Sequence, residues 1–317
     1  MTWLAGAATR SLVVEVPATS ANLGAGYDCL GLALDIVNTT ELRPLPDTGG
    51  RIELEVDGEG AELLPADRSN RFVIALEAGL TRGGQPVPAG LGWAIRMRNR
   101  IPLARGLGSS AAATIGGLVA AQALLRGALS DDELMAMALE IEGHADNAAA
   151  ALLGGMVVVD GGDGRPLALR FDAPDRLVCV LFIPDRQLST ASMRACLPES
   201  VPLVNAVANL GHVAVGVAGL STGRLDVLDR LTRDQLHEPY RARLYPELPV
   251  LVRAARSAGA VGACLSGAGS TIVAFTDSYA HAEKIGAAML AGAGDAEIVG
   301  RVEIAAPRNE RACAREA

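Results

Sequence analysis

A glycine-containing loop runs directly into an alanine-rich segment at Ile101-Pro102-Leu103-Ala104-Arg105-Gly106-Leu107-Gly108-Ser109-Ser110-Ala111-Ala112-Ala113. Gly106 and Gly108 allow backbone conformations that other residues avoid, and they let a bulky ligand approach the main chain. Ser109 and Ser110 fall where the N-cap and first-turn residues of a helix sit. A helix N-terminus presents unpaired N–H groups and the positive end of a dipole. The segment therefore predicts a phosphate site, with a turn that merely caps a helix as the alternative.

This loop differs from a Walker phosphate loop. No Gly-Lys-Ser or Gly-Lys-Thr occurs in the chain, and Lys284, in a helix-like segment far downstream, is its only lysine. A mechanism that requires a phosphate-loop lysine is thereby excluded. The phosphate charge must instead be neutralised by backbone amides, a metal ion or arginine.

The composition is that of an α/β or α+β enzyme. Of the 317 residues, 50% are hydrophobic and 3% are aromatic, which argues against disorder, and the length predicts two domains. The net charge of −8 excludes the basic surface that nucleic-acid-binding proteins carry. We therefore expect a small-molecule substrate and no nucleic-acid partner.

The N-terminal residues and the cysteines indicate the cellular compartment of the protein. Residues 1–10 have no basic region ahead of an apolar run, so they do not predict a signal peptide. The longest apolar runs are interrupted by Gly, Asn or Asp, and we expect no membrane-spanning segment. The five cysteines form no Cys-x-x-Cys pair, which favours reduced thiols in a cytoplasmic protein over a zinc site or a disulfide framework.

Hydrophobic periodicity predicts strands and helices along the whole chain. We expect strands at residues 12–16, 30–37, 51–56, 91–98, 154–159, 177–183 and 270–275, and helices at residues 72–80, 111–125, 202–219, 225–231, 249–258 and 279–290. A further helix opens at Ser130, which is matched to Glu133 in a capping-box pattern, and reaches about Glu142. Turn-forming composition makes residues 18–26 a loop, residues 160–166 the domain boundary and residues 308–317 a frayed terminus.

Four polar side chains gather within Glu142-Gly143-His144-Ala145-Asp146-Asn147. By itself this segment is typical of a helix C-terminus, with Gly143 as the stop signal. One histidine among carboxylates is a poor site for a transition metal. Mg²⁺ prefers oxygen ligands and keeps several waters, so one carboxylate and one hydroxyl suffice beside ATP phosphates. Glu142 and Ser110 can supply that pair.

Two other loops are rich in small residues. Residues 17–31 can bring Asn22 and Asp28 close to a compact polar ligand, although an Asx-type turn also explains them. The second loop is Leu265-Ser266-Gly267-Ala268-Gly269-Ser270-Thr271, just before a predicted strand. It can close over phosphates or form a simple tight turn.

The order and spacing of these four segments resemble the homoserine kinases of the GHMP kinase superfamily, over essentially the whole chain. Residues 17–34 are similar to the first family motif, residues 101–113 to the phosphate loop, and residues 266–271 to the third motif, with Ser270 where proline is usual. The resemblance implies an α+β fold of two domains. A ribosomal-protein-S5-domain-2-like, ATP-binding domain would span residues 1–163, and a ferredoxin-like α/β sandwich residues 164–317.

The same resemblance implies roles for individual residues. Asp28, Ser110 and Glu142 would be catalytic, and Ser110 and Glu142 would hold Mg²⁺. ATP would be bound by Asn70, Pro102, Arg105, Gly106, Leu107, Gly108, Ser109, Ser110, Ala111, Gly267 and Gly269. L-Homoserine would be bound by Asn22, Asp28, His144, Asp146, Asn147, Thr190, Arg194 and Arg241.

Two segments are similar to those that supply arginines to the amino-acid carboxylate in this family. They are Thr190-Ala191-Ser192-Met193-Arg194 and His237-Glu238-Pro239-Tyr240-Arg241. Guanidinium offers paired donors that match a carboxylate, so Arg194 and Arg241 suit this role chemically. Arg243 is a rival to Arg241, and an exposed surface position is the alternative for each arginine.

The implied reaction is the phosphorylation of L-homoserine by ATP to O-phospho-L-homoserine, in threonine synthesis, by a cytoplasmic homodimer. Positioning and charge neutralisation dominate phosphoryl transfer. The proton acceptor stays open among Asp28, Asp146 and the phosphate itself. Two other functions are open: another GHMP small-molecule kinase, of the mevalonate or shikimate type, and a non-catalytic metabolite sensor. The intact Glu142 and phosphate-loop serines disfavour the sensor.

Overall fold

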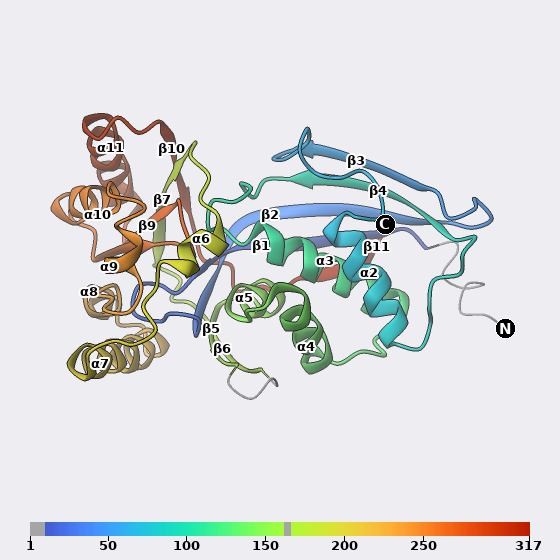
Figure 1. The fold of residues 1–317 in the computed structure, drawn as a ribbon, viewed down its shortest axis with the longest axis horizontal. Coiled ribbons are helices and arrows are strands. Elements are labelled where there is room, and N and C mark those ends of the chain that lie inside the picture. The colour runs from blue at the N-terminus through green and yellow to red at the C-terminus, as the bar shows by residue number, and fades with distance from the viewer. Residues whose placement is uncertain (1–9, 162–165) are drawn as a thin grey trace.

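The computed structural model describes residues 10–161 and 166–317, which form an elongated molecule built on two sheets (Figure 1). The larger sheet has the strand order β11-β1-β2-β4-β3, with β5 paired to β2 and β6 paired to β5. Its strands are β1 (Leu12–Ala21), β2 (Leu30–Leu45), β3 (Ile52–Gly58), β4 (Gly92–Asn99), β5 (Met156–Asp160), β6 (Leu167–Phe171) and β11 (Cys313–Glu316). The segment judged for a signal peptide and the centre of the expected domain boundary lie outside the described residues.

Four helices pack over one face of the larger sheet (Figure 1). They are α2 (Arg71–Arg82), α3 (Ser109–Leu124), α4 (Asp131–Glu142) and α5 (Asp146–Leu153). The central helix α3 is buried on nearly all sides, which its alanine-rich and glycine-containing sequence permits. Gly117 lets α2 approach closely, since a Cβ there would lie 2.3 Å from the Phe72 carbonyl oxygen. The N-terminus of α3 is thereby held in a fixed place.

The smaller sheet is antiparallel, with the order β10-β7-β9-β8. Its strands are β7 (Val178–Pro184), β8 (Gly262–Leu265), β9 (Ile272–Thr276) and β10 (Gly300–Ala305), and α10 (Leu248–Ser257) and α11 (Tyr279–Asp295) pack on it. Side chains of β7 alternate between two cores: Val180 and Phe182 belong to one, and Cys179 and Leu181 to the other, which the larger sheet shares. Burial on both faces explains why β7 is a continuous apolar run.

The 19-residue helix α7 and several shorter helices lie at the same end of the molecule (Figure 1). They are α6 (Thr190–Ala195), α7 (Leu203–Ser221), η1 (Leu225–Val227), α8 (Leu228–Leu231) and α9 (Glu238–Arg241). The helix α7, with a mean hydropathy of 1.6, is long and apolar enough to cross a membrane by length and composition only. Core helices of soluble proteins pass the same test, so the expectation of no membrane-spanning segment stays a prediction. The mean hydropathy of α7 is high although the helix contains Asn and Gly residues. Of its apolar window, 22% is buried inside the protein.

Local sequence signals predicted many element ends correctly. Ser130 and Glu133 form the expected capping box at the start of α4, and Gly143 ends that helix with a φ of 77°. The loop expected from residue 18 is wrong over its first four residues, which continue β1. The strand passes Pro17, which lacks a backbone N–H, through a register shift between Pro17 and Ala18, and then pairs with β2 again.

The expectation of a frayed terminus at residues 308–317 is also wrong. Residues 313–316 form β11, which pairs antiparallel with β1. Arg311 binds Asp131 at 2.7 Å, and Arg315 binds Glu15 at 2.6 Å. Pairing with the open edge of the larger sheet supplies hydrogen bonds that local sequence does not reveal. Both β6 and β11 follow residue 163 yet belong to the larger sheet, and the boundary at 163/164 stays a prediction.

Candidate active site

The predicted anion site lies at the N-terminus of α3. Gly108 is the N-cap residue, with a φ of 71°, and no side chain caps the helix. A Cβ on Gly108 would lie 1.9 Å from Thr19 Oγ1, so glycine alone meets both the φ and the space available. The first turn of α3 borders a cavity of about 540 Å³. Its N–H groups are therefore available to an anionic ligand there.

Two glycine loops pack backbone against backbone beside this helix. Ser266 Oγ donates to the Gly106 carbonyl oxygen at 2.7 Å, and the Gly267 N–H donates to the Ala21 carbonyl oxygen at 3.0 Å. A Cβ on Gly106 would lie 2.1 Å from the Ser266 carbonyl oxygen. The third motif therefore holds the phosphate loop in place, and neither loop is an isolated tight turn.

The Glu142 carboxylate lies beside the phosphate loop, with its side chain 4% exposed. It accepts hydrogen bonds from Ser110 Oγ at 2.8 Å and from Thr114 Oγ1 at 2.5 Å. Arg71 forms an ion pair with it at 3.0 Å. Thr114 and Arg71 are absent from the predicted set. Thr114 stands one helical turn after Ser110, and this spacing is the signal that could have found it.

Most of the predicted site residues line the 540 Å³ cavity. These are Asn22, Asp28, Arg105, Gly106, Leu107, Gly108, Ser109, Ser110, Ala111, Glu142, His144, Asp146, Asn147, Thr190, Arg194, Arg241 and Gly267. They come from both sheets and from loops far apart in the sequence, so the tertiary fold assembles one polar site from the four segments.

An ion pair spans one side of the cavity. Arg194 NH1 and NH2 donate to the two carboxylate oxygens of Asp28 at 2.8 and 2.7 Å. Arg194 NH1 also donates to the Tyr27 hydroxyl at 2.9 Å, and the guanidinium lies 5.6 Å from the Tyr27 ring centroid. Bonding to Asp28 raises the pKa of Arg194, so this guanidinium stays charged. Tyr27 is a third residue that sequence reasoning missed.

The segment after α4 adds a second acidic group to the lining of the cavity. Asp146 is 2% exposed, and its Oδ1 atom lies 3.2 Å from His144 Nδ1. The contact with Asp146 raises the pKa of His144. Asn147 Oδ1 accepts from Thr19 Oγ1 at 2.7 Å, while Asn22 Nδ2 donates to the Gly267 carbonyl oxygen at 2.8 Å. These bonds fix the side chains that line the cavity.

Arg241 is 1% exposed and is held by acceptors from three segments. Its Nε donates to the Met193 carbonyl oxygen at 3.2 Å, and its NH1 donates to the Gly267 carbonyl oxygen at 2.9 Å. The third acceptor is His237 Nδ1, at 3.2 Å. The Tyr27 ring centroid lies 5.3 Å from this guanidinium. Tyr27 therefore contacts both predicted carboxylate-binding arginines.

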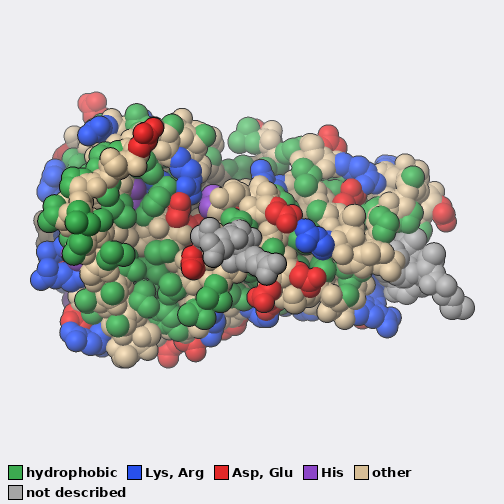
Figure 2. Space-filling view, turned by 60° about the horizontal axis from the view of Figure 1, so that its bottom comes forward, with side chains coloured by type: hydrophobic (Ala, Val, Ile, Leu, Met, Phe, Trp, Pro, Cys, Tyr) green, Lys and Arg blue, Asp and Glu red, His purple; other side chains and the backbone are tan. Residues whose placement is uncertain are grey.

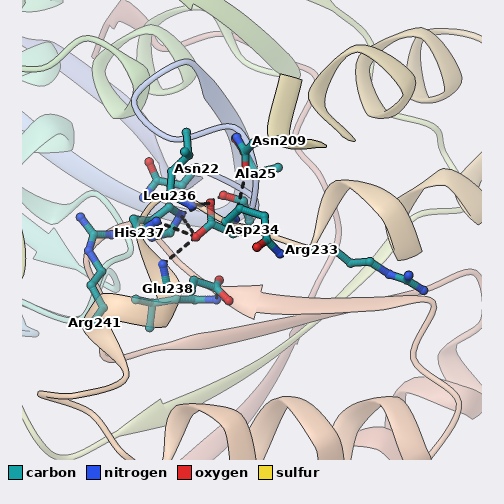
Figure 3. Close-up of polar contacts among 12 residues, drawn as sticks. Asn22, Ala25, Asn209, Arg233, Asp234, Leu236, His237, Glu238 and Arg241 are labelled. Atoms are coloured by element: carbon teal, nitrogen blue, oxygen red, sulfur yellow. Dashed lines mark hydrogen bonds and ion pairs between the residues drawn. The ribbon is translucent and has the colours of Figure 1, made fainter. Parts of the chain in front are cut away.

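The segment before Arg241 is a buried polar network (Figure 3). Asp234 accepts from the backbone N–H groups of His237 at 2.7 Å and Glu238 at 2.6 Å. Glu238 Oε1 accepts from the Leu265 N–H at 2.7 Å. Burial lowers the pKa of His237 to about 4 and raises the pKa of Glu238 to about 8.

Several predicted residues stand apart from the cavity. Asn70 lines an adjoining cavity of about 370 Å³, and its side chain also caps α2. Pro102 and Gly269 line neither cavity. The Arg105 side chain donates to backbone carbonyls of residues 103, 184 and 185. Arg243 is exposed and lies over the Tyr240 ring, so the structure places Arg241, and not its rival, at the cavity.

A larger hollow of about 830 Å³ lies on the larger sheet, away from the predicted residues. Its charged side chains pair with one another, as Arg96 does with Glu55 at 3.1 Å. Within residues 10–161 and 166–317, no three His, Cys, Asp or Glu side chains cluster in a way that could hold a metal ion.

Comparison with known proteins identifies the family. Models of the GHMP kinases N terminal domain and the GHMP kinases C terminal match residues 70–155 and 217–295. A homoserine kinase of Carboxydothermus hydrogenoformans is 44% identical over 82% of this chain and 84% of its own length. The chain belongs to the homoserine kinase family of the GHMP kinases. A second member of the homoserine kinase family, from Streptomyces avermitilis, is 43% identical over 92% of this chain and 93% of its own.

Solved structures confirm the two-domain GHMP kinase fold. A crystal structure of homoserine kinase from Cytophaga hutchinsonii superposes with a TM-score of 0.86 at 32% identity, over 97% of this chain and 98% of that one. An L. major mevalonate kinase in complex with R-mevalonate has a TM-score of 0.70 at 18% identity, over 93% and 96% of the two chains, and shows the fold alone. Family membership makes the protein an ATP-dependent kinase that acts on an alcohol.

Proposed function

We propose that this homoserine kinase family member transfers the γ-phosphoryl group of ATP to the hydroxyl of L-homoserine. One observation carries the proposal: a single cavity joins the N-terminus of α3 to two guanidinium groups and two aspartates. A helix N-terminus suits phosphate, and paired cationic and anionic side chains suit an amino-acid zwitterion. The 43–44% identity to homoserine kinases supports the same substrate.

The two arginines and two aspartates divide the zwitterion between them in this proposal. Arg194 and Arg241 bind the carboxylate, and Asp28 and Asp146 receive the ammonium group. Because Asp28 and Arg194 bind each other, the substrate exchanges one internal ion pair for two new ones. A ligand with a single charge would leave a half-buried partner without its counter-ion, which is costly.

ATP is proposed to lie across the two neighbouring cavities. Its phosphates meet the backbone N–H groups of residues 106–111, and its base enters the 370 Å³ cavity, whose lining includes Phe72, Met97 and Leu103. Apolar walls with a few polar groups are typical of a base-binding pocket. Arg105 contributes through its backbone, because its guanidinium is bound to carbonyl groups of the chain.

Glu142 and Ser110 are proposed to hold Mg²⁺. They lie 2.8 Å apart, and one buried carboxylate with one hydroxyl fits a cation that takes its other ligands from water and phosphate. When bound, Mg²⁺ neutralises charge on the transferring phosphoryl group. Thr114 orients the carboxylate by a hydrogen bond, and Arg71 pairs with it.

Asp28 is proposed to orient the substrate and not to remove its proton. Without substrate, both Asp28 carboxylate oxygens accept from Arg194, and in this proposal the carboxylate turns to the ammonium group of the substrate. Phosphoryl transfer passes through a loose transition state, so an early deprotonation of the alcohol is unnecessary. Holding the hydroxyl in line with the γ-phosphate is then the main task of the pocket.

The functional unit is proposed to be a cytoplasmic homodimer. Reduced, scattered cysteines and the small-molecule substrate support the compartment. No sequence feature directs the chain to nucleic acid, and the acidic net charge of −8 disfavours such a partner.

Two substrate analogues test the proposal with matched changes. ADP release is measured with L-homoserine, 4-hydroxybutyrate (which lacks the ammonium group) and 3-aminopropan-1-ol (which lacks the carboxylate). We expect turnover of L-homoserine and at least about a 100-fold lower kcat/KM for each analogue. Equal turnover of mevalonate and L-homoserine would instead assign a mevalonate-type kinase, and ATP binding without any turnover would assign a sensor.

A further inference from the structure

Arg71 lies where the two neighbouring cavities meet. It is the first residue of α2, and its side chain is 46% exposed. The described residues that line both the cavity of about 540 Å³ and the cavity of about 370 Å³ are Arg71, Ala104, Ser109, Ser110 and Thr190. Arg71 is the only one of these that carries a charge. A ligand that extends from one cavity into the other therefore passes this guanidinium group.

The other arginines that line the 540 Å³ cavity are bound to neutral groups of the protein or to the substrate-side aspartate. Arg105 donates to three backbone carbonyl oxygens. Arg241 is 1% exposed and donates to two carbonyl oxygens and a histidine ring. Arg194 donates to both oxygens of Asp28. Arg71 is therefore the arginine of this lining that is best placed to bind a phosphate group.

The surface as a whole does not supply positive charge for a phosphate chain. The net charge is −8, and the only lysine, Lys284, lies in α11 on the smaller sheet. Figure 2 shows basic side chains in small separate groups, with acidic side chains between them. A polyphosphate therefore depends on the groups that it touches directly, and not on a broad positive field.

The present partner of Arg71 is the proposed metal ligand. Arg71 NH1 donates to Glu142 Oε1 at 3.0 Å, and the Glu142 side chain is 4% exposed. A buried carboxylate needs a counter-charge, which Arg71 supplies here. Once Glu142 holds Mg²⁺, its charge is balanced by the metal, and the guanidinium can turn to another anion. Its fork of N–H donors matches the oxygens of a phosphate group.

We propose that Arg71 exchanges Glu142 for the α- and β-phosphates, which ATP and ADP share. This inference rests on the proposed function, which places ATP across both cavities. The α- and β-phosphates are the ones next to the nucleoside, and Arg71 borders the cavity assigned to the base. The γ-phosphate, in contrast, must reach the substrate alcohol. An arginine of α2 thereby does part of the work that a lysine does in a Walker loop.

The first test measures ADP binding by calorimetry, without metal, in the Glu142→Gln background. Glutamine removes the carboxylate charge, so an unpaired Glu142 cannot repel the nucleotide there. We expect Arg71→Ala in this background to weaken ADP binding at least about 10-fold. Arg71→Lys, which keeps the charge and loses the fork, should weaken it less. ATP affinity should fall by the same factor as ADP affinity.

Arg82→Ala is the matched control for this test. Arg82 ends the same helix, is 45% exposed and pairs with Glu140 of α4 at 3.2 Å. It lines neither cavity. The substitution removes an ion pair between the same two helices, so ADP affinity should stay unchanged. Circular dichroism checks that each variant is folded.

The second test keeps Glu142 and adds Mg²⁺ in excess. Arg71→Ala alone should again weaken ADP binding at least about 10-fold. A role limited to pairing with Glu142 predicts the opposite result. Without Arg71 that carboxylate would be freer to bind the metal, and ADP would bind as well as or more tightly than in wild type.

Four results would overturn the inference. Arg71→Ala could leave ADP affinity unchanged in the Glu142→Gln background, or leave it unchanged or higher in the second test. A loss of affinity for ATP and not for ADP would place the contact at the γ-phosphate instead. Failure of wild type to bind ADP would overturn both this inference and the proposed function. Failure to phosphorylate L-homoserine would refute the proposed function alone, because none of these measurements involves L-homoserine or turnover.

Discussion

His237 and Arg241 form a hydrogen bond whose direction the surroundings dictate. His237 Nε2 lies 2.8 Å from the Gly24 carbonyl oxygen, and Nδ1 lies 3.2 Å from Arg241 NH1. A carbonyl oxygen can only accept, so Nε2 carries the proton. Nδ1 is then the acceptor for the guanidinium. His237 is therefore neutral, and it ties Arg241 to the loop that contains Asn22 and Asp28.

This relationship makes His237 a positioning residue for the proposed carboxylate site. His237→Leu removes the acceptor beside Arg241 and should raise the KM for L-homoserine about 10-fold or more, with a much smaller effect on the KM for ATP. His237→Gln offers one donor and one acceptor at similar spacing and should restore most of the affinity. Initial-rate kinetics with each substrate varied in turn measure both constants. Equal KM values for L-homoserine in the two variants would contradict this role.

The buried imidazole should also make stability depend on pH. Burial lowers the pKa of His237 from an ordinary 6.5 to about 4, so between these values the unfolded chain binds more protons than the folded chain. The contribution of the neutral His237 imidazole to the free energy of unfolding is fully present above about pH 6.5 and is lost as the pH falls toward 4. Urea unfolding from pH 7 to pH 4.5 should show a steeper loss of stability in wild type than in His237→Gln.

Glu238 provides the internal comparison for that experiment. Burial raises its pKa from 4.5 to about 8, so its contribution is fully present below about pH 4.5 and is lost as the pH rises through 8. Glu238→Gln should therefore remove a loss of stability that runs from about pH 4.5 to about pH 8. Below about pH 6.5 this change opposes the one due to His237, so the Glu238 contribution is measured by itself between pH 6.5 and pH 8. If the free energy of unfolding changed with pH in the same way in wild type, His237→Gln and Glu238→Gln, these roles of His237 and Glu238 would be refuted.

Replacing Glu142 tests the proposed metal site. Glu142→Gln should bind ATP nearly as well as wild type but lose on the order of 10² or more in turnover at limiting Mg²⁺. Thr114→Val, which removes one hydrogen bond to the same carboxylate, should lose less and be partly rescued by excess Mg²⁺. Measuring kcat as a function of Mg²⁺ concentration distinguishes the Glu142→Gln variant from the Thr114→Val variant. Wild-type turnover of Glu142→Gln at limiting Mg²⁺ would exclude the metal role.

A pair of glycine variants separates backbone strain from crowding at the phosphate loop. Gly108→Ala places a Cβ 1.9 Å from Thr19 Oγ1, whereas Gly127→Ala has a similar φ and nothing within 4 Å. Both variants should be destabilised by about 1 kcal/mol from the left-handed backbone. Gly108→Ala alone should also lose ATP affinity, measured by calorimetry. Unchanged ATP binding in Gly108→Ala would make the loop a simple helix cap.

Two arginine variants test which guanidinium groups bind the substrate. Arg194→Leu should raise the KM for L-homoserine at least about 100-fold and leave the KM for ATP nearly unchanged, because a charged hydrogen bond to the carboxylate is lost. Arg243→Leu should have almost no effect, since Arg243 is exposed and lies over Tyr240. A large effect of Arg243→Leu would restore it as the rival of Arg241.

The sequence predicted elements best where the signal is local. The capping box at Ser130 and the stop at Gly143 both depend on residues within a few positions of one another. The N-cap of α3 was predicted one residue too late, because Gly108, and not Ser109, is the N-cap residue. The strand β11 could not be predicted in this way, because its stability comes from pairing with β1 some 300 residues away. Arg71 was missed for the same reason, because only packing brings it to Glu142, whereas the helical spacing of Thr114 after Ser110 was a local signal that was not used.

By itself the sequence determined the hydrogen-bonding capacity and the backbone freedom of the site segments, including a glycine loop without lysine, because these follow from residue type and short spacing. The roles of Glu142 toward a metal and of the arginines toward a carboxylate stay predictions. The tertiary structure alone decided that Arg241 and not Arg243 enters the cavity, and that Tyr27 and His237 hold the arginines. Those choices depend on contacts between segments up to about two hundred residues apart, whose geometry arises only when both domains are packed.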